Sequence, residues 1–363
     1  MSGGVDSSVT AKLLAEKDYD LSAIFMRNWD TRDESGTDVG CEWEKDWEDV
    51  QRVCQKLDIP CQMIDLSKEY WLRVFEPAVE TWESGNTPNP DVWCNGEIKF
   101  GALFDHLPQG TQFLATGHYA RKAYHPSNHR PKLMRASDQT KDQTYYLSSI
   151  PESSLDMALF PLADVSKTQV REIARAGRLH NASREESMGL CFIGERRRFN
   201  DFLGDYVAPR PGPILAIDTN VELGQHNGLW TYTIGQGSGL PGLTRKLFVA
   251  AKDHEKNAIY VALADHPALS TASLTSNDFR WIWRDEPPSA AFSRDGFRAS
   301  VQVRHRMPPV PVRVRQRWTS NTVHITFDEP HKAVAQGQIA VLYDGDHCLG
   351  CGTINETKNL AQV

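Results

Sequence analysis

The chain of 363 residues is 40% hydrophobic and 9% aromatic, so it is long and apolar enough for two or three packed domains and is not a disordered chain. Its 40 Lys and Arg are outnumbered by 47 Asp and Glu, and the formal net charge of -7 excludes a basic coat over the whole surface. No run approaches the roughly 18 uninterrupted apolar residues of a membrane helix. Seven cysteines, an odd number spread along the chain, favour a reducing compartment, where cysteine chemistry is catalytic.

Strand and helix signals alternate in the first half of the chain. Apolar residues at helical spacing, as in Trp47, Val50, Cys54 and Leu57, predict an amphipathic helix. The predicted strands are residues 21–26, 62–66 and 113–116. One predicted helix begins directly after residue 8, and two more cover residues 47–57 and 69–82. A Pro/Asn-rich segment at 87–95 predicts an irregular loop. Strands separated by helices predict a parallel sheet covered on both faces.

The character of the sequence changes near residue 206. Pro, Gly and short β-rich runs dominate the next part, and the last part alternates short strands with turn residues. The predicted strands here are residues 229–234, 247–251, 299–304, 310–315, 323–327 and 339–343. We therefore predict an α/β domain with a parallel sheet over residues 1–205, a central β-rich domain over 206–273 and a small C-terminal β-barrel over 274–363.

A glycine-containing heptamer stands at the amino end, directly before the first predicted helix. It reads Ser2-Gly3-Gly4-Val5-Asp6-Ser7-Ser8. Glycines let backbone N–H groups approach an anion, the unpaired amides of the first helical turn point to the same place, and the serine hydroxyls add donors. The Lys of a Walker loop is absent. The functional interpretation is a phosphate cradle, and the alternative is a glycine turn capped by Asp6 or Ser7.

Two cysteines, Cys94 and Cys191, lie in segments that contain Gly and Asn or Arg. Moving sulfur onto carbon needs one thiol that carries a persulfide and a second thiolate that cleaves it or receives the carrier. Unselected pairs of thiols are more often buried and inert. Cys348 and Cys351 are spaced like zinc ligands, but no second pair stands near them, so we interpret them as neighbouring strand positions and predict no metal site.

Positive charge is concentrated in the last third of the chain. Seven arginines stand against Asp295 alone, at positions 294, 298, 304, 306, 313, 315 and 317. They are either solvated strand edges or a surface that contacts the phosphate backbone of a polyanion.

The heptamer resembles the pyrophosphate loop of the N-type ATP pyrophosphatases (the PP-loop superfamily), which split ATP into AMP and pyrophosphate while adenylating a substrate oxygen. Within that superfamily the whole chain is similar to the tRNA-uridine 2-sulfurtransferases, or 2-thiouridylases, and the two cysteines distinguish this branch. The matching stretches are residues 23–29, 87–94, 115–120, 141–147, 189–196, 232–236 and 336–338.

The resemblance implies a role for each matched residue. Cys94 is implied as the nucleophile, Cys191 as the persulfide carrier and Asp91 as a proton acceptor beside the target base. The implied ATP-binding residues are Ser2, Gly3, Gly4, Val5, Asp6, Ser7, Ser8, Met26 and Gly117. The implied substrate-binding residues are Asn89, Pro90, Asp91, His118, Lys141, Asp142, Gln143, Arg304, His305 and Gln338. Asp91, His118 and Gln338 also have plain structural interpretations, as a turn cap, a buried imidazole and a barrel turn.

The same resemblance implies ATP-dependent 2-thiolation of the wobble uridine (U34) of tRNA, with ATP, Mg²⁺ and a persulfide donor such as a sulfur relay or cysteine desulfurase. It also implies a monomer without membrane contact, located in mitochondria. Relatives have an apolar strand ahead of the heptamer, whereas only Met1 precedes it here, so we expect the amino terminus to be incomplete. Two other functions stay open: a PP-loop ATP pyrophosphatase that amidates or ligates a small metabolite, and a tRNA-binding protein without catalysis.

Overall fold

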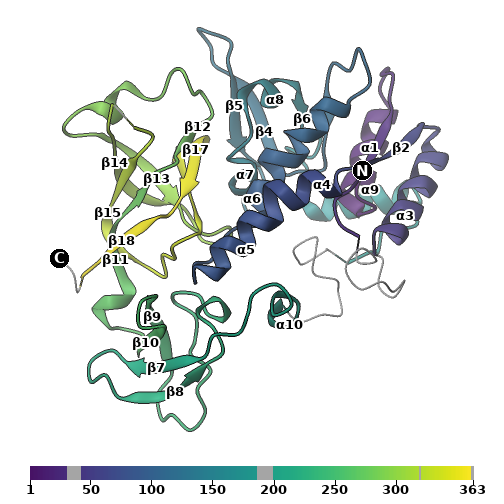
Figure 1. Ribbon diagram of the computed structural model, residues 1–363. Coiled ribbons are helices and arrows are strands. Elements are labelled where there is room, and N and C mark those ends of the chain that lie inside the picture. The colour runs from purple at the N-terminus through teal and green to yellow at the C-terminus, as the bar shows by residue number, and fades with distance from the viewer. Residues whose placement is uncertain (31–41, 186–198, 319, 361–363) are drawn as a thin grey trace. The chain divides into compact units, whose positions relative to one another are not determined.

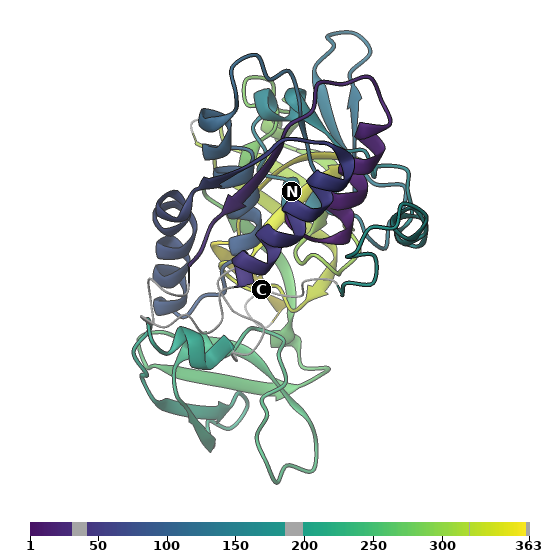
Figure 2. The ribbon, with the colours of Figure 1, turned by 90° about the vertical axis from the view of Figure 1, so that its right-hand side faces the viewer.

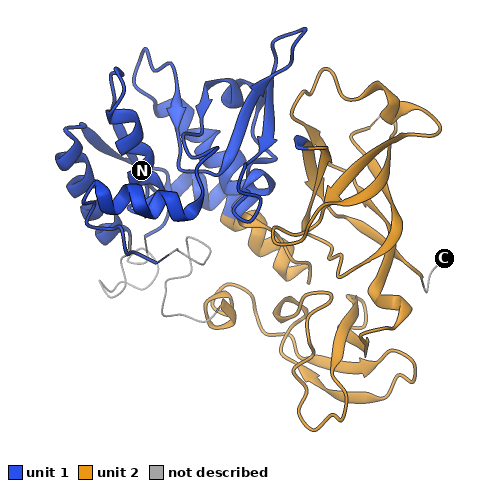
Figure 3. Cartoon of the chain, turned by 180° about the vertical axis from the view of Figure 1, so that it is seen from behind, with its two compact units in different colours: residues 1–74, 91–197, 346–348 blue, residues 75–90, 198–345, 349–363 orange. Residues whose placement is uncertain are grey.

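The computed structural model describes residues 1–30, 42–185, 199–318 and 320–360 of the chain. The chain divides into two compact units, coloured blue and orange in Figure 3. Unit 1 comprises residues 1–74, 91–197 and 346–348, and unit 2 comprises 75–90, 198–345 and 349–363. Unit 2 therefore takes up the segment immediately before residue 91, although the chain on either side of that segment belongs to unit 1. The predicted domain limits at residues 205 and 273 stay a prediction.

Unit 1 begins with alternating helices and strands, as predicted. Helix α1 (Val5–Ala15) is followed by β1 (Ala23–Arg27), α3 (Glu42–Leu57) and β2 (Cys61–Asp65). The two strands pair in parallel, from Ala23 opposite Cys61 to Arg27 opposite Asp65. Helix α1 packs beside α3 and α9 (Lys167–Ala176), an arrangement visible in Figures 1 and 2. Val9 of α1, Val53 of α3 and Val170 of α9 are fully buried in one apolar cluster, which holds the amino end of α1 in place.

The remaining elements of unit 1 include a second parallel strand pair, in which β3 (Leu114–Ala115) lies beside β6 (Ala158–Leu159). The others are short helices and two further strands. They are α4 (Ser67–Tyr70), α6 (Pro90–Trp93), a π-helix (Cys94–Lys99), a 3-10 helix (Ala102–His106), β4 (Ala120–Tyr124), β5 (Pro131–Arg135), α7 (Thr144–Leu147) and α8 (Glu152–Met157). A π-helix over Trp71–Phe75 joins α4 to α5 (Glu76–Glu83), where the sequence predicts one helix. No helix among the described residues is long and apolar enough to cross a membrane.

The predicted irregular loop at residues 87–95 is wrong in its second half, because α6 and the π-helix begin there. Proline suits the first position of a helix, since its fixed φ is helical and its missing N–H would have no partner there. The apolar side chains that follow decide the outcome. Val92 and Ile98 are 1% and 0% exposed, and burying them stabilises helical backbone that the turn-rich composition disfavours.

Unit 2 contains α5, α10 (Phe199–Leu203) and two β-sheets. The smaller sheet has the order β8-β7-β10-β9, with β7 (Gly212–Ala216), β8 (Glu222–His226), β9 (Leu247–Asp253) and β10 (Ala258–Leu263). The predicted strand at residues 229–234 is wrong, because Leu229–Thr231 form a 3-10 helix. The Thr231 hydroxyl donates to the Gly228 carbonyl at 2.7 Å, and the side chains of Leu229 and Trp230 are buried. This hydrogen bond and this burial stabilise a helical turn in place of a strand.

The larger sheet of unit 2 is antiparallel and runs in the order β18-β11-β15-β14-β13-β16-β17, with β12 beside β17. Its strands are β11 (Ser270–Ser276), β12 (Arg280–Trp281), β13 (Phe297–Gln302), β14 (Val310–Gln316), β15 (Val323–Lys332), β16 (Ile339–Asp344), β17 (His347–Thr353) and β18 (Glu356–Asn359). Among the described residues, no strand pair closes this sheet into a ring. Val301, Val312, Val314 and Ile325 are fully buried on its inner face. The predicted fold class, an α/β domain followed by β-rich parts, is confirmed.

Candidate functional site

The heptamer forms a tight turn at the amino end of α1. Gly3 adopts φ +73, and a Cβ built on it would stand 2.9 Å from the Asp46 carbonyl oxygen, so this position requires glycine. The Ser7 and Ser8 hydroxyls donate to the Gly4 carbonyl at 3.1 and 2.9 Å. The first N–H groups of a helix have no acceptor within the helix. The turn therefore presents amide donors in a space that a side chain would fill, and this fits an anionic phosphate group.

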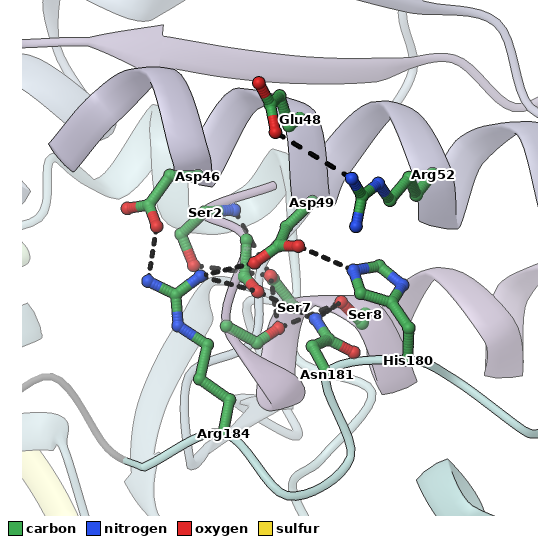
Figure 4. Close-up of polar contacts among 12 residues, drawn as sticks. Ser2, Ser7, Ser8, Asp46, Glu48, Asp49, Arg52, His180, Asn181 and Arg184 are labelled. Carbon is green, nitrogen blue, oxygen red and sulfur yellow. Dashed lines mark hydrogen bonds and ion pairs between the residues drawn. The ribbon is translucent and has the colours of Figure 1, made fainter. Parts of the chain in front are cut away.

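Three side chains from the segment after α9 contact this turn or the residues of α3 beside it, as Figure 4 shows. The Asn181 amide donates to the Gly3 carbonyl at 2.7 Å and to the Ser8 hydroxyl at 2.8 Å. Arg184 forms ion pairs with Asp46 and, at 2.9 Å, with Asp49 of α3. His180 contacts the other Asp49 oxygen at 2.7 Å (Figure 4). These three residues were not predicted, because a lone Asn or Arg far along the chain carries no recognisable spacing.

The other predicted ATP-binding residues lie around α1 and on β1. The Asp6 carboxylate accepts bonds from Lys167 at 2.7 and 2.8 Å and from the Tyr119 hydroxyl at 2.8 Å. A Cβ on Gly117 would stand 2.9 Å from the Ser7 amide nitrogen, so Gly117 lies directly against the first turn of α1. Met26 lies on β1 opposite Ile64 of β2 and is half-buried. Gly117 is thus brought to the heptamer, and Asp6 is held by ion pairing.

Cys94 lies where α6 passes into the π-helix and is 7% exposed, so it is a buried helical residue. Asp91 precedes it by three residues, about one helical turn. The Asn95 amide donates to the Asp91 carbonyl at 2.9 Å and fixes this junction. Burial raises the pKa of the Asp91 carboxyl to about 6, although the positive charge of Lys99 opposes that rise. A carboxyl group with a pKa near 6 accepts protons effectively at neutral pH.

His118 is held by two polar partners beside this helix. Its Nε2 lies 3.4 Å from Lys99 Nζ and its Nδ1 lies 2.9 Å from the Thr116 hydroxyl. Burial, and then the charge of Lys99, lower the pKa of His118 well below its usual value, so the ring is neutral at physiological pH. Because an ammonium group can only donate, Nε2 accepts from Lys99 and Nδ1 carries the proton towards Thr116. His118 is therefore a hydrogen-bond acceptor in this network.

The predicted substrate residues Asp142 and Gln143 bond to unit 1 itself. The buried Asp142 carboxylate accepts a bond from Arg135 at 3.1 Å. The Gln143 side-chain oxygen accepts from the Tyr119 backbone N–H at 3.0 Å. Lys141 is half-buried. These contacts hold the segment before α7 against the strand that follows His118.

In unit 2, Gln338 holds the segment that leads into α6. Its amide donates to the carbonyls of Thr87 and Pro88 at 2.9 and 3.0 Å, and its oxygen lies 3.4 Å from the Asn89 amide. Gly337 has φ +88, and a Cβ there would meet the Thr87 amide nitrogen at 2.8 Å. The two residues thus clamp residues 87–89, and Pro90 follows as a buried residue.

Three arginines of the predicted strip lie on β13 and β14 of the larger sheet of unit 2. Arg298 of β13 is paired in register with Arg313 of β14, and Arg315 follows two positions later on the same face. Their side chains alternate with the buried Val312 and Val314, so they point away from the core. Arg298 and Arg315 are exposed, and Arg313 is half-buried. This face presents positive charge to solvent.

Arg304 and His305 follow β13. The Arg304 guanidinium donates to the Ile234 carbonyl at 2.7 Å, and the Gln302 amide donates to the carbonyls of Arg304 and His305 at 3.1 and 2.6 Å. Both predicted residues are half-buried and sit in a bonded turn.

Cys191 lies outside the described residues, as do residues 189–196 of the matching stretch. Cys348 and Cys351 are buried thiols on β17, as neighbouring strand positions. Among the described residues, no group of three or more His, Cys, Asp or Glu side chains could hold a metal ion.

Three family models match the chain in succession. They are the tRNA methyl transferase HUP domain over residues 1–195, the tRNA methyl transferase PRC-barrel domain over 200–263 and the aminomethyltransferase beta-barrel domain over 271–354. The tRNA-specific 2-thiouridylase MnmA of Alkaliphilus oremlandii is 43% identical over 362 residues, which cover 98% of this chain and 96% of that protein. Proteins of the same name from Geobacillus thermodenitrificans and Bacillus subtilis are each 41% identical over 360 residues, 98% of this chain and 93% and 94% of theirs.

Proposed function

Because this chain belongs to the tRNA-specific 2-thiouridylase family, we propose that it replaces the C2 oxygen of a tRNA uridine with sulfur, at the expense of ATP. One observation from the structure carries the proposal most directly. The Gly3 turn lies at the start of α1, and Gly117 beside it is followed at once by His118, whose ring contacts Lys99 of the π-helix that begins at Cys94. These contacts support a phosphate site and a reactive thiol within unit 1.

The first half of the reaction activates the uridine. The C2 oxygen attacks the α-phosphorus of ATP and pyrophosphate leaves, so that a poor leaving group becomes AMP. The amides of the heptamer and of the first turn of α1 stabilise the phosphate charge. Mg²⁺, when bound with the ATP phosphates, would supply further charge neutralisation.

The second half transfers the sulfur. An external persulfide donor loads Cys191, and the Cys94 thiolate attacks the inner sulfur of that persulfide. A Cys94–Cys191 disulfide forms and hydrosulfide leaves; it attacks C2 of the uridine and displaces AMP, which takes the oxygen. Alternatively the persulfide attacks C2 first and Cys94 then cleaves the S–S bond. In both routes a two-electron reductant, such as an external dithiol, resets the disulfide.

The tRNA itself needs a surface for its backbone. We propose that the outward arginines of β13 and β14 contact the phosphates of the stem, because arginine forms bidentate, salt-sensitive bonds to them. The target base must then leave its stack to reach the thiol, as enzymes that modify bases require. The wobble position (U34) as the target, the monomeric state and the mitochondrial location belong to this proposal as predictions.

The decisive experiment is mass analysis of nucleosides from tRNA incubated with the protein, ATP, Mg²⁺ and a persulfide source. We expect 2-thiouridine with the native chain and at least about 100-fold less with Cys94→Ser or Cys191→Ser, because each thiol has a separate step. Both variants should bind tRNA as the native chain does. Cys348→Ser, a buried thiol outside this chemistry, is the matched control. Full thiolation by either Ser variant would refute the assignment, and pyrophosphate release without tRNA stimulation would favour a small metabolite as substrate.

A further inference from the structure

Lys99 is a partly buried cation in unit 1 to which no role has been assigned so far. It closes the π-helix Cys94–Lys99. Its ammonium group donates to the Asn95 side-chain oxygen at 3.2 Å and lies 3.4 Å from His118 Nε2. Within the described chain no carboxylate pairs with it. Because these two partners of the ammonium are neutral groups, no carboxylate among the described residues offsets its effect on nearby ionisable groups.

The π-helix decides where that charge lies relative to the reactive thiol. In a π-helix the backbone hydrogen bonds join residues five apart, so Lys99 stands one hydrogen-bonded turn beyond Cys94. Asp91 stands about one turn before Cys94 in α6. In a regular α-helix, residues five apart would point to widely different sides of the helix. The π-helix therefore brings the cation and the thiol towards the same side.

The neighbouring side chains limit how the ammonium can move. His118 is neutral and accepts through Nε2, while its Nδ1 proton is directed to Thr116, after the short strand β3. The Asn95 side-chain oxygen accepts a hydrogen bond from Lys99, and the Asn95 side-chain nitrogen donates one to the backbone carbonyl of Asp91. The ammonium is thus tied both to the helix that carries it and to the segment after β3. This arrangement fixes the position of the charge before the reaction occurs, so little reorganisation is needed during it.

We propose that the Lys99 ammonium, positioned by Asn95 and His118, is the fixed charge that stabilises the Cys94 thiolate. The inference rests on the proposed function, since it assumes that Cys94 reacts as a thiolate. His118 acts here as a positioning residue for Lys99. A fixed cation close to a thiol favours its reactive form, as lysine, arginine and protonated histidine do beside reactive cysteines.

Other charged groups face the same ammonium and enter the pH dependence. Burial raises the pKa of Asp91 and Lys99 opposes that rise; burial, and after it the charge of Lys99, lowers the pKa of His118 and that of the Met1 amino group. An ionised Asp91 disfavours the Cys94 thiolate, and Lys99 compensates for it. The pKa of Asp91 is about 6, so this carboxyl is ionised above that pH. Measurements above that pH therefore report on Cys94 with the charge of Asp91 nearly constant.

The test measures the alkylation rate of Cys94 by iodoacetamide in the full chain between about pH 6.5 and 10, followed by peptide mass analysis. We expect the native Cys94 to titrate below the ordinary thiol pKa of about 8.5. Lys99→Met should raise the midpoint by about one pH unit, which is about tenfold slower alkylation at pH 7. Lys99→Arg should restore most of the rate, and Lys68→Met, at an exposed helical lysine, should leave it unchanged.

Two results would overturn the proposal. The first is a midpoint for the native Cys94 at or above that of an ordinary thiol, which requires no variant and so no assumption about folding. The second is an unchanged midpoint in a folded Lys99→Met protein. The titration uses no ATP, tRNA or sulfur donor. If the Cys94→Ser protein still thiolates tRNA, the proposed role of Cys94 in thiolation is refuted. The titration would still show whether Lys99 lowers the pKa of the Cys94 thiol.

Discussion

The charged side chains of unit 1 around Cys94 lie in partly buried networks, whereas those of the arginine strip in unit 2 lie on an exposed strand face. Burial shifts the pKa of Asp91 upward and that of His118 downward, and Lys99 is held between polar partners. Arg298 is 70% exposed and forms one surface ion pair with Asp328 at 2.8 Å. The first arrangement can alter proton affinities, and the second leaves charge available to an outside partner.

The difference follows from the dielectric response of the surroundings. In a partly buried site, charges a few ångströms apart interact strongly, so single residues tune the chemistry. On an exposed face each pair is worth little, and the effect comes from several charges acting together on a polyanion. We therefore expect large effects from single substitutions in the buried network and smaller effects, spread over several residues, in the strip.

The largest effect tests the buried network. Asp91→Asn should slow thiolation about 100-fold, because an amide cannot accept the proton. The same change should raise the melting temperature by a few degrees at pH 8 and less at pH 5. Burial raises the folded pKa of this carboxyl from its ordinary value of 3.8 to about 6, so ionisation of Asp91 favours unfolding as pH rises between those values.

Calorimetry at both pH values and single-turnover thiolation measure these expectations. The native enzyme should also lose activity as pH falls through about 6, the pKa of Asp91. If Asp91→Asn is less stable than the native protein at pH 8, burial of the ionised Asp91 carboxylate does not destabilise the fold. If Asp91→Asn thiolates tRNA at the native rate, Asp91 is not the proton acceptor. The conservative variant Asp91→Glu, which keeps a carboxylate, is the control.

The next effect tests the exposed strip. Replacing Arg298, Arg313 and Arg315 together by Glu should weaken tRNA binding about 10- to 100-fold at moderate salt. It should also flatten the dependence of the logarithm of affinity on salt, by about 0.7 to 0.9 for each phosphate that the variant leaves unneutralised. Filter binding over a salt series measures both quantities. The control replaces exposed cations of unit 1, Lys17, Lys68 and Arg73, by Glu for the same change in net charge. Equal weakening in both variants would show that overall charge alone matters.

The smallest effect concerns Gln338, for which the family resemblance implies contact with tRNA and the structure shows contact with Thr87 and Pro88. If Gln338 acts by holding that segment, Gln338→Ala should lower the thiolation rate a few-fold. It should cost about 1 to 3 kcal/mol of stability, since two carbonyls lose their donor. The tRNA affinity should stay within about twofold, by the same binding assay. Gln225→Ala, at an exposed position of β8, is the control. A large drop in affinity with an unchanged rate would instead favour direct tRNA contact.

Local patterns predicted most of the elements and the glycine turn before α1. The spacing of Trp47, Val50, Cys54 and Leu57 predicted a helix, and α3 covers Glu42–Leu57. The alternating pattern of residues 310–315 predicted a strand, and β14 covers Val310–Gln316. Both patterns are informative because apolar residues that recur with the period of a helix or of a strand all lie on the face that packs against the core. The family resemblance and the proposed enzyme class are confirmed by the comparisons.

Local patterns failed where burial overrode local preference. The Pro and Asn residues before Cys94 predict a loop, but the burial of Val92 and Ile98 stabilises a helix that places the thiol inside unit 1. The resemblance implies Asp142 as a substrate-binding residue, and this stays a prediction; the structure shows its carboxylate buried and bonded to Arg135 of β5.

Residue types and their spacing over a few positions were enough to predict the glycine turn before α1 and the outward arginines, and the resemblance of several short stretches indicated the sulfur-transferring tRNA enzyme family. Each of these features depends on neighbours along the chain. Folding in three dimensions was needed to bring Asn181 and Arg184 to the Gly3 turn, to set His118 against Lys99 and to bury Asp91. Such contacts join residues far apart in the chain, and burial and charge act through distance in space, which spacing along a sequence does not specify.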